Sequence, residues 1–167
     1  MTAHEMDERT VRRVRQLGLF FEELELGVIY EHRPGRTIGE ADNTLFTTLT
    51  MNPASIHLDA HESQSSEFGA RIVNSMLTVS TVVGLSVGQL TLGTTVANLG
   101  FTEIAFPRPV FHGDTLYAET EVIEKRPSKS RPDNGVVLFE HRGRRPDGEL
   151  VVVARRTALM KRLPRKD

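Results

Sequence analysis

The sequence of 167 residues contains no cysteine, which excludes disulfides, thiolate catalysis and cysteine-ligated zinc. It also lacks a charge excess, because 21 basic residues stand against 22 acidic ones. The net charge therefore gives no overall electrostatic attraction to nucleic acid or to an anionic membrane. Polar residues interrupt every apolar run before it reaches the length of a membrane span. The first residues lack the basic and apolar regions of a signal peptide, so we expect a cytoplasmic, single-domain globular protein.

The N-terminal third mixes short helical and extended patterns. Residues 7–25 place apolar side chains at three- and four-residue spacing, which predicts a helical arm over residues 1–26 packed on a domain of residues 27–167. A strand is expected at residues 27–32, closed by the turn-forming pair Pro34-Gly35. The acidic segment Glu40-Ala41-Asp42 is typical of a helix N-terminus, and Pro53 is expected to stop that helix.

The centre of the chain predicts a core helix. No residue from Ile72 to Thr102 is charged, which predicts burial of the whole segment, and its first part shows helical spacing in Phe68, Ile72, Met76, Val79 and Val83. Strand-like runs follow at residues 94–106, 114–125, 136–145 and 151–161. One strand, a buried helix and four further strands predict an α+β hotdog fold, in which a curved antiparallel sheet of about five strands wraps a long central helix.

A candidate site lies where the helix after Glu40 ends. There Met51-Asn52-Pro53-Ala54-Ser55-Ile56-His57 places a histidine on irregular backbone just before the core helix. The segment resembles the Asp-x-Asn-Pro-x-His signature of the MaoC-like, (R)-specific enoyl-CoA hydratases. The resemblance implies that His57 helps to add water across the double bond of an enoyl thioester, and a side chain that titrates near neutrality suits this work.

The match departs from the family at one position. Asn52 stands where the family has its catalytic aspartate, and an amide can orient a water but cannot take its proton. Three interpretations remain open: His57 does the acid/base work with Asn52 as positioner, Asp42 or Asp59 substitutes, or hydration of simple enoyl-CoA has been lost. We favour the first. Asp59 is better explained as a helix N-cap. His57 and His61 are four residues apart and could bind one metal ion if helical. Asp59 is the only further ligand nearby and the sequence has no cysteine, so no metal is expected.

A second stretch is similar to the family segment that opens the central helix. It runs Phe68-Gly69-Ala70-Arg71-Ile72-Val73-Asn74-Ser75-Met76-Leu77, with Asn74-Ser75 where His-Gly is usual. The resemblance implies that a backbone amide there binds the thioester oxygen, at the positive end of the helix dipole. Alternatively, Asn74 and Ser75 only satisfy backbone groups at the helix start. A third match, Pro109-Val110-Phe111-His112-Gly113-Asp114-Thr115-Leu116, supports the fold more than the chemistry.

Basic residues suggest the substrate. The loop Ser128-Lys129-Ser130-Arg131 is similar to that of members acting on mesaconyl-CoA and itaconyl-CoA, and Lys129 and Arg131 fit coenzyme A phosphates, although a solvated turn would look the same. A dicarboxylic acyl group also needs a cation for its free carboxylate. Arg36 and Arg71 are the candidates, unless both are ordinary surface arginines.

We therefore expect a hydro-lyase that adds water to, or removes it from, a short branched enoyl-CoA, with C5 dicarboxylic itaconyl-CoA or mesaconyl-CoA as examples. Acyl-CoA and water would be its partners, with no metal or redox cofactor, no nucleic acid and no membrane. A homodimer or dimer of dimers is expected. The alternatives are a hotdog thioesterase, which would release thiol, and a non-catalytic acyl-CoA binding module.

Overall fold

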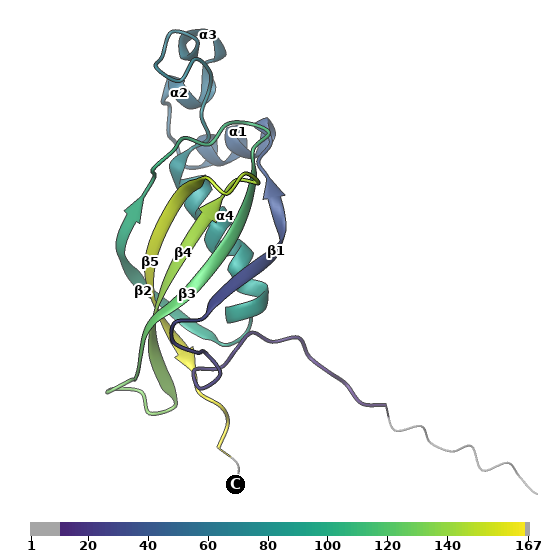
Figure 1. Cartoon of the computed structure of the whole chain (residues 1–167), viewed down its shortest axis with the longest axis vertical. Helices are drawn as coiled ribbons and strands as arrows, with labels where there is room; N and C mark the ends of the chain where they lie inside the picture. Colours follow the sequence, from purple (N-terminus) through teal and green to yellow (C-terminus); the bar gives the residue numbers. More distant parts are fainter. Residues whose placement is uncertain (1–10, 166–167) are drawn as a thin grey trace, which may run out of the picture.

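The protein folds as a curved sheet around one helix (Figure 1). A computed structural model describes residues 11–165. In chain order the elements are β1 (Ile29–Thr37), α1 (Glu40–Leu49), α2 (Ser55–Leu58), α3 (Ala60–Ser63), α4 (Ser75–Ser86), a π-helical turn (Val87–Thr91), β2 (Thr95–Ala105), β3 (Thr115–Pro127), β4 (Asn134–Arg144) and β5 (Leu150–Lys161). The antiparallel sheet has the order β1-β3-β4-β5-β2. The predicted α+β arrangement of a central helix and five strands is confirmed.

Alternation along β3 turns one of its faces toward the interior. Leu116, Ala118, Thr120 and Val122 are buried while the residues between them are half-buried, as expected where one face meets the core. The core has two apolar clusters. The first surrounds Val79 and Val82 of α4, and the second surrounds Phe139 of β4. None of the described helices is long and apolar enough to cross a bilayer.

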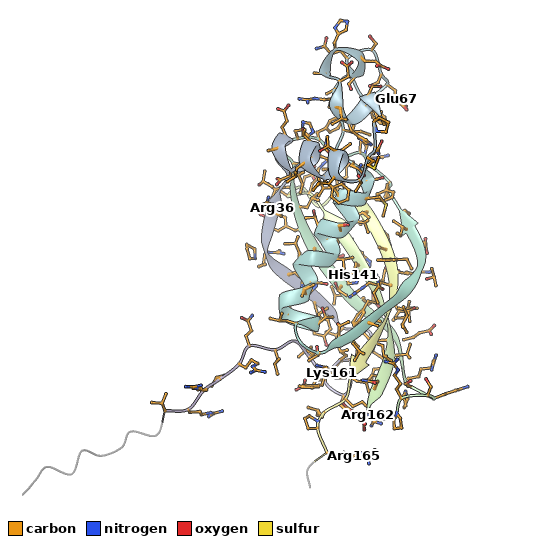
Figure 2. The ribbon with its side chains drawn as sticks, turned by 180° about the vertical axis from the view of Figure 1, so that it is seen from behind. Arg36, Glu67, His141, Lys161, Arg162 and Arg165 are labelled. Carbon is orange, nitrogen blue, oxygen red and sulfur yellow. The ribbon has the colours of Figure 1, made fainter. Side chains whose placement is uncertain are left out.

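A chain of buried polar side chains crosses four strands on the helix-facing side of the sheet. Arg156 Nε donates to His141 Nε2 at 3.1 Å, His141 Nδ1 lies 2.8 Å from Thr120 Oγ1, and Thr120 Oγ1 lies 2.9 Å from His32 Nε2. His32 Nδ1 lies 2.7 Å from Gln89 Oε1. Because Arg156 can only donate, His141 Nε2 must accept, so His141 is neutral with its proton on Nδ1. The amide oxygen of Gln89 can only accept, so His32 Nδ1 also carries a proton, and burial lowers the pKa of His32, which favours its neutral form. Figure 2 shows His141 inside the molecule.

The helical arm predicted over residues 1–26 is wrong for residues 11–26, which contain no helix; residues 1–10 lie outside the described range. Several amides of the arm bond across to other segments instead. Gly18 N donates to Leu92 O at 2.8 Å and Phe21 N to Lys161 O at 2.9 Å. Phe21 and Leu24 are buried, so the expected packing of the arm on the domain is present.

Two predicted boundaries were wrong. Pro34-Gly35 does not close the first strand, since β1 continues to Thr37 with a register shift between His32 and Arg36. Gly35 lies against the Tyr117 ring, where a Cβ would come within 2.6 Å of a ring carbon, so the glycine permits a close approach rather than a turn. The central helix begins only at Ser75, which leaves Phe68 and Ile72 before it.

The uncharged segment 72–102 is not wholly buried, contrary to the prediction. Strand β2 forms one edge of the sheet, and its side chains Val96, Leu99 and Phe101 are 40%, 53% and 40% exposed. An apolar edge strand of this kind offers unpaired backbone groups to another chain.

Candidate active site

Helix α1 begins with its own cap, as predicted. Asp42 Oδ2 accepts from Gly39 N at 2.9 Å, and Asp42 Oδ1 accepts from Arg36 Nη2 at 2.7 Å. The hydrogen bond from the Gly39 amide, followed by the charge of Arg36, lowers the pKa of Asp42. This carboxylate is therefore committed to the helix N-terminus and is a poor substitute base.

Helix α1 ends in a tight turn that contains Asn52, one of the predicted site residues. Met51 has φ 55°, a left-handed conformation that favours glycine, and Asn52 N donates back to Thr47 O at 3.0 Å. Asn52 Oδ1 then accepts from Ala54 N at 3.0 Å. The side chain of Asn52 is thus fixed by its own turn, and its oxygen retains a second lone pair for another donor.

His57, in α2, has a defined tautomer. Its Nδ1 lies 2.9 Å from the carbonyl oxygen of Ile72, and since a carbonyl only accepts, Nδ1 must carry the proton. The other ring nitrogen, Nε2, has no hydrogen-bond partner among residues 11–165. The bond to Ile72 O therefore orients the His57 ring and leaves Nε2 available to a ligand or a water.

Asp59 lies between α2, which contains His57, and α3, which contains His61, and it caps the N-terminus of α3. Its Oδ1 accepts from the amides of His61 and Glu62, both at 2.9 Å, and the bond from Glu62 is the largest cause of its lowered pKa. The predicted N-cap role is confirmed. His57 and His61 lie on different short helices, and the described residues contain no group of three or more potential metal-ligating side chains.

Asn43 joins the pieces of the site, and the sequence analysis missed it. Its side chain is fully buried in α1; Oδ1 accepts from Asn74 N at 2.8 Å, and Nδ2 donates to His57 O at 3.2 Å and to His112 Nε2 at 3.1 Å. Burial, then the charge of Arg71, lowers the pKa of His112, which keeps the acceptor nitrogen unprotonated. A polar residue on the inner face of a short helix was the only available signal.

The N-terminus of α4 lies beside these residues. Asn74 is the N-cap, with Oδ1 accepting from Met76 N at 3.0 Å, so its side chain satisfies a backbone group. The amide of Ser75 has no hydrogen-bond partner in the described range. Ser75 also lines a cavity of about 300 Å³, together with apolar Phe68, Ile72 and Phe106. The first residue of α4, whose amide has no partner in the described range, therefore lines an apolar cavity together with Ile72, whose carbonyl oxygen holds His57.

The predicted basic residues do not gather at this cavity. Arg36 pairs with Asp42, and Arg71 pairs with Glu40 at 2.5 Å; neither lines it. Lys129 and Arg131 line a separate cavity between the β3–β4 loop and β2. Figure 1 shows this loop and helices α1–α3 at opposite ends of the sheet. Lys161, at the end of β5, pairs with Asn134, which follows the β3–β4 loop. Figure 2 shows Arg36 far from Lys161, and therefore far from this end of the sheet.

The comparisons identify the family that this geometry fits. Residues 23–142 match the family model of the MaoC like domain, and the chain belongs to this family. It is 33% identical over 135 residues to a mesaconyl-CoA hydratase of Cereibacter sphaeroides, covering 81% of this chain but 39% of that protein. The chain thus spans about two fifths of the length of this curated relative.

Solved structures agree with the fold. A MaoC-like dehydratase from Rhodospirillum rubrum superposes with a TM-score of 0.79 and 29% identity, covering 89% of this chain and 100% of that one. A Mycobacterium tuberculosis protein described as having a double hotdog fold gives a TM-score of 0.80 at 23% identity, covering 92% of this chain and 47% of that one. The predicted hotdog fold and MaoC-like resemblance are confirmed.

Proposed function

We propose that the protein is a hydro-lyase that hydrates a short branched enoyl-CoA, or dehydrates the corresponding 3-hydroxyacyl-CoA. The observation that carries this proposal is the orientation of His57: its Nδ1 donates to the carbonyl oxygen of Ile72, which leaves Nε2 without a partner among residues 11–165, and Ile72 lines a cavity together with Ser75. The mesaconyl-CoA hydratase relative supports a C5 dicarboxylic acyl group.

The residues divide the reaction as follows. A water donates one hydrogen to His57 Nε2 and the other to the free lone pair of Asn52 Oδ1. His57 removes the proton as the water oxygen attacks the β-carbon, and the electron pair of the double bond moves toward the thioester. The Ser75 amide binds the resulting enolate oxygen. His57 then returns its proton to the α-carbon. Water and the thioester are the only reactants that this scheme needs.

A second copy would complete the coenzyme A site. Within one chain, Lys129 and Arg131 lie at the far end of the sheet from His57. A two-fold axis that pairs β2 with the β2 of another copy makes the two strands antiparallel. The Thr95 end of one strand, which adjoins the basic loop, would then approach the Ala105 end of the other, which leads into the His57 cavity. The exposed apolar side chains of β2 fit this pairing, so we propose a homodimer.

The direct test measures loss of the enoyl-thioester ultraviolet band with crotonyl-, mesaconyl- and itaconyl-CoA, alongside release of free thiol. We expect hydration without thiol release, and a loss of at least about 100-fold in kcat for His57→Ala, as is typical for removal of a general base. His61→Ala is the matched control, because His61 is exposed on the neighbouring helix.

Other results would favour the alternatives. Thiol release in step with loss of the enoyl-thioester band would indicate a thioesterase, because hydrolysis of the thioester also removes this band. Binding without turnover, together with activity gained in Asn52→Asp, would indicate an acyl-CoA binding module. Phe101→Glu tests the dimer: light scattering should show a monomer with weakened substrate binding, and a stable dimer in this variant would contradict the pairing of β2.

A further inference from the structure

The cavity beside His57 contains one cationic side chain that the ion pairs of α1 do not use. Of its ten described lining residues, seven are apolar, Ser75 and Thr78 carry hydroxyls, and Arg108 carries the only charge. Arg36 and Arg71, the cations expected from sequence, are neutralised by Asp42 and Glu40 and lie elsewhere. A charged group bound in this cavity would therefore meet Arg108 first.

The surroundings of Arg108 hold its guanidinium at the rim. Nε donates to Glu149 Oε1 at 3.0 Å and Nη1 donates to Pro107 O at 3.3 Å. Nη2 has no hydrogen-bond partner in the part of the chain that the structure describes. Proline on both sides, at 107 and 109, restricts the backbone that carries it. The side chain is thus oriented by two contacts and retains donors for a ligand.

Arg108 is not the only cation that pairs with Glu149. The same carboxylate also pairs with Arg145, and Arg145 Nε donates in turn to Asp114 Oδ2 at 3.0 Å. Glu149 is therefore shared with Arg145, and it contacts Arg108 only at Nε, which leaves Nη2 of Arg108 available to a second carboxylate.

We propose that Arg108 is the specificity-determining residue that binds the free carboxylate of a dicarboxylic acyl group. This inference rests on the proposed function. Ser75 and Arg108 line the same cavity, so an acyl group whose thioester oxygen meets the Ser75 amide can extend across the apolar wall to Arg108. Apolar walls favour a branched hydrocarbon, and a guanidinium favours a carboxylate at its end.

The experiment compares two thioesters that share coenzyme A but differ in the terminal carboxylate. We expect Arg108→Gln to lower kcat/KM for mesaconyl-CoA by about 10- to 100-fold, the range of a charged hydrogen bond, and that for crotonyl-CoA by less than about threefold. Arg108→Lys should recover part of the loss. Arg33→Gln is the control, because Arg33 forms a similarly exposed pair with Glu31 at 3.7 Å. Equal losses with both thioesters, or no loss with mesaconyl-CoA, would overturn the assignment.

A binding measurement separates this inference from the proposed reaction. Saturated succinyl-CoA and butyryl-CoA cannot be hydrated, and calorimetry should show that the wild type prefers succinyl-CoA while Arg108→Gln does not. That result in a protein without hydratase activity would support Arg108 and contradict the hydro-lyase. Hydration of crotonyl-CoA without any preference for succinyl-CoA would support the hydro-lyase and contradict Arg108.

Discussion

Acidification should destabilise the fold through His141, because this histidine is buried as a neutral hydrogen-bonding group. Burial, then the charge of Arg156, lowers the pKa of His141 to about 3 from an ordinary 6.5. The unfolded chain therefore binds more protons than the folded chain between these two values. The contribution to stability is complete above pH 6.5 and is lost progressively as the pH falls towards 3.

The magnitude follows from the difference in proton binding. Between pH 7.5 and 5.0, His141 alone should cost ~2 kcal/mol of the free energy of unfolding, because each pH unit below the unfolded pKa is worth about 1.4 kcal/mol. Burial also lowers the pKa of His32, so its effect has the same sign. Asp42 and Asp59 have lowered pKa values, and carboxylates with such values lose their contribution mainly below this window.

Urea unfolding at pH 7.5, 6.5, 5.5 and 5.0, at one fixed protein concentration, would measure this slope. His141→Gln should be less stable at pH 7.5, because a flexible amide replaces the ring that bonds Arg156 and Thr120 from two fixed positions, but its stability should decline by ~2 kcal/mol less across the series. His61→Gln, a change at an exposed histidine, should keep the wild-type slope. Parallel curves for wild type and His141→Gln would refute the reasoning.

Three further changes test the packing and the site. Gly135→Ala should lower the free energy of unfolding by about 1–3 kcal/mol in urea, because a Cβ would come within 2.0 Å of the Phe21 ring; unchanged stability would contradict the docking of the arm. Asn43→Ala should lower the melting temperature and also reduce kcat for enoyl-CoA, since one side chain bonds both His57 and Asn74; a kcat equal to that of wild type would show that Asn43 is only structural. Asp59→Ala should accelerate hydrogen exchange at the amides it caps, and unaltered exchange there would contradict the cap.

The sequence alone determined the elements whose signals are local. Alternating side chains located β3 because a half-buried strand needs a two-residue period. The carboxylate of Asp42 marked the start of α1 and that of Asp59 the start of α3, because a cap bonds amides only two or three residues away. The resemblance around His57 likewise depended on a short continuous segment.

The tertiary structure decided whatever depends on segments far apart in the chain. Nothing in residues 11–26 reveals that the amides of Gly18, Leu19 and Phe21 bond to residues 90–92 and 161 instead of forming a helix, so the periodicity predicted a helix wrongly. Likewise, Arg36 and Arg71 are as basic as Arg108 in the sequence. All three pair with an acidic residue, and only the fold places Arg108, and neither of the others, in the wall of the cavity. Charge is a property of a residue, but its availability to a ligand depends on what the rest of the chain brings near it.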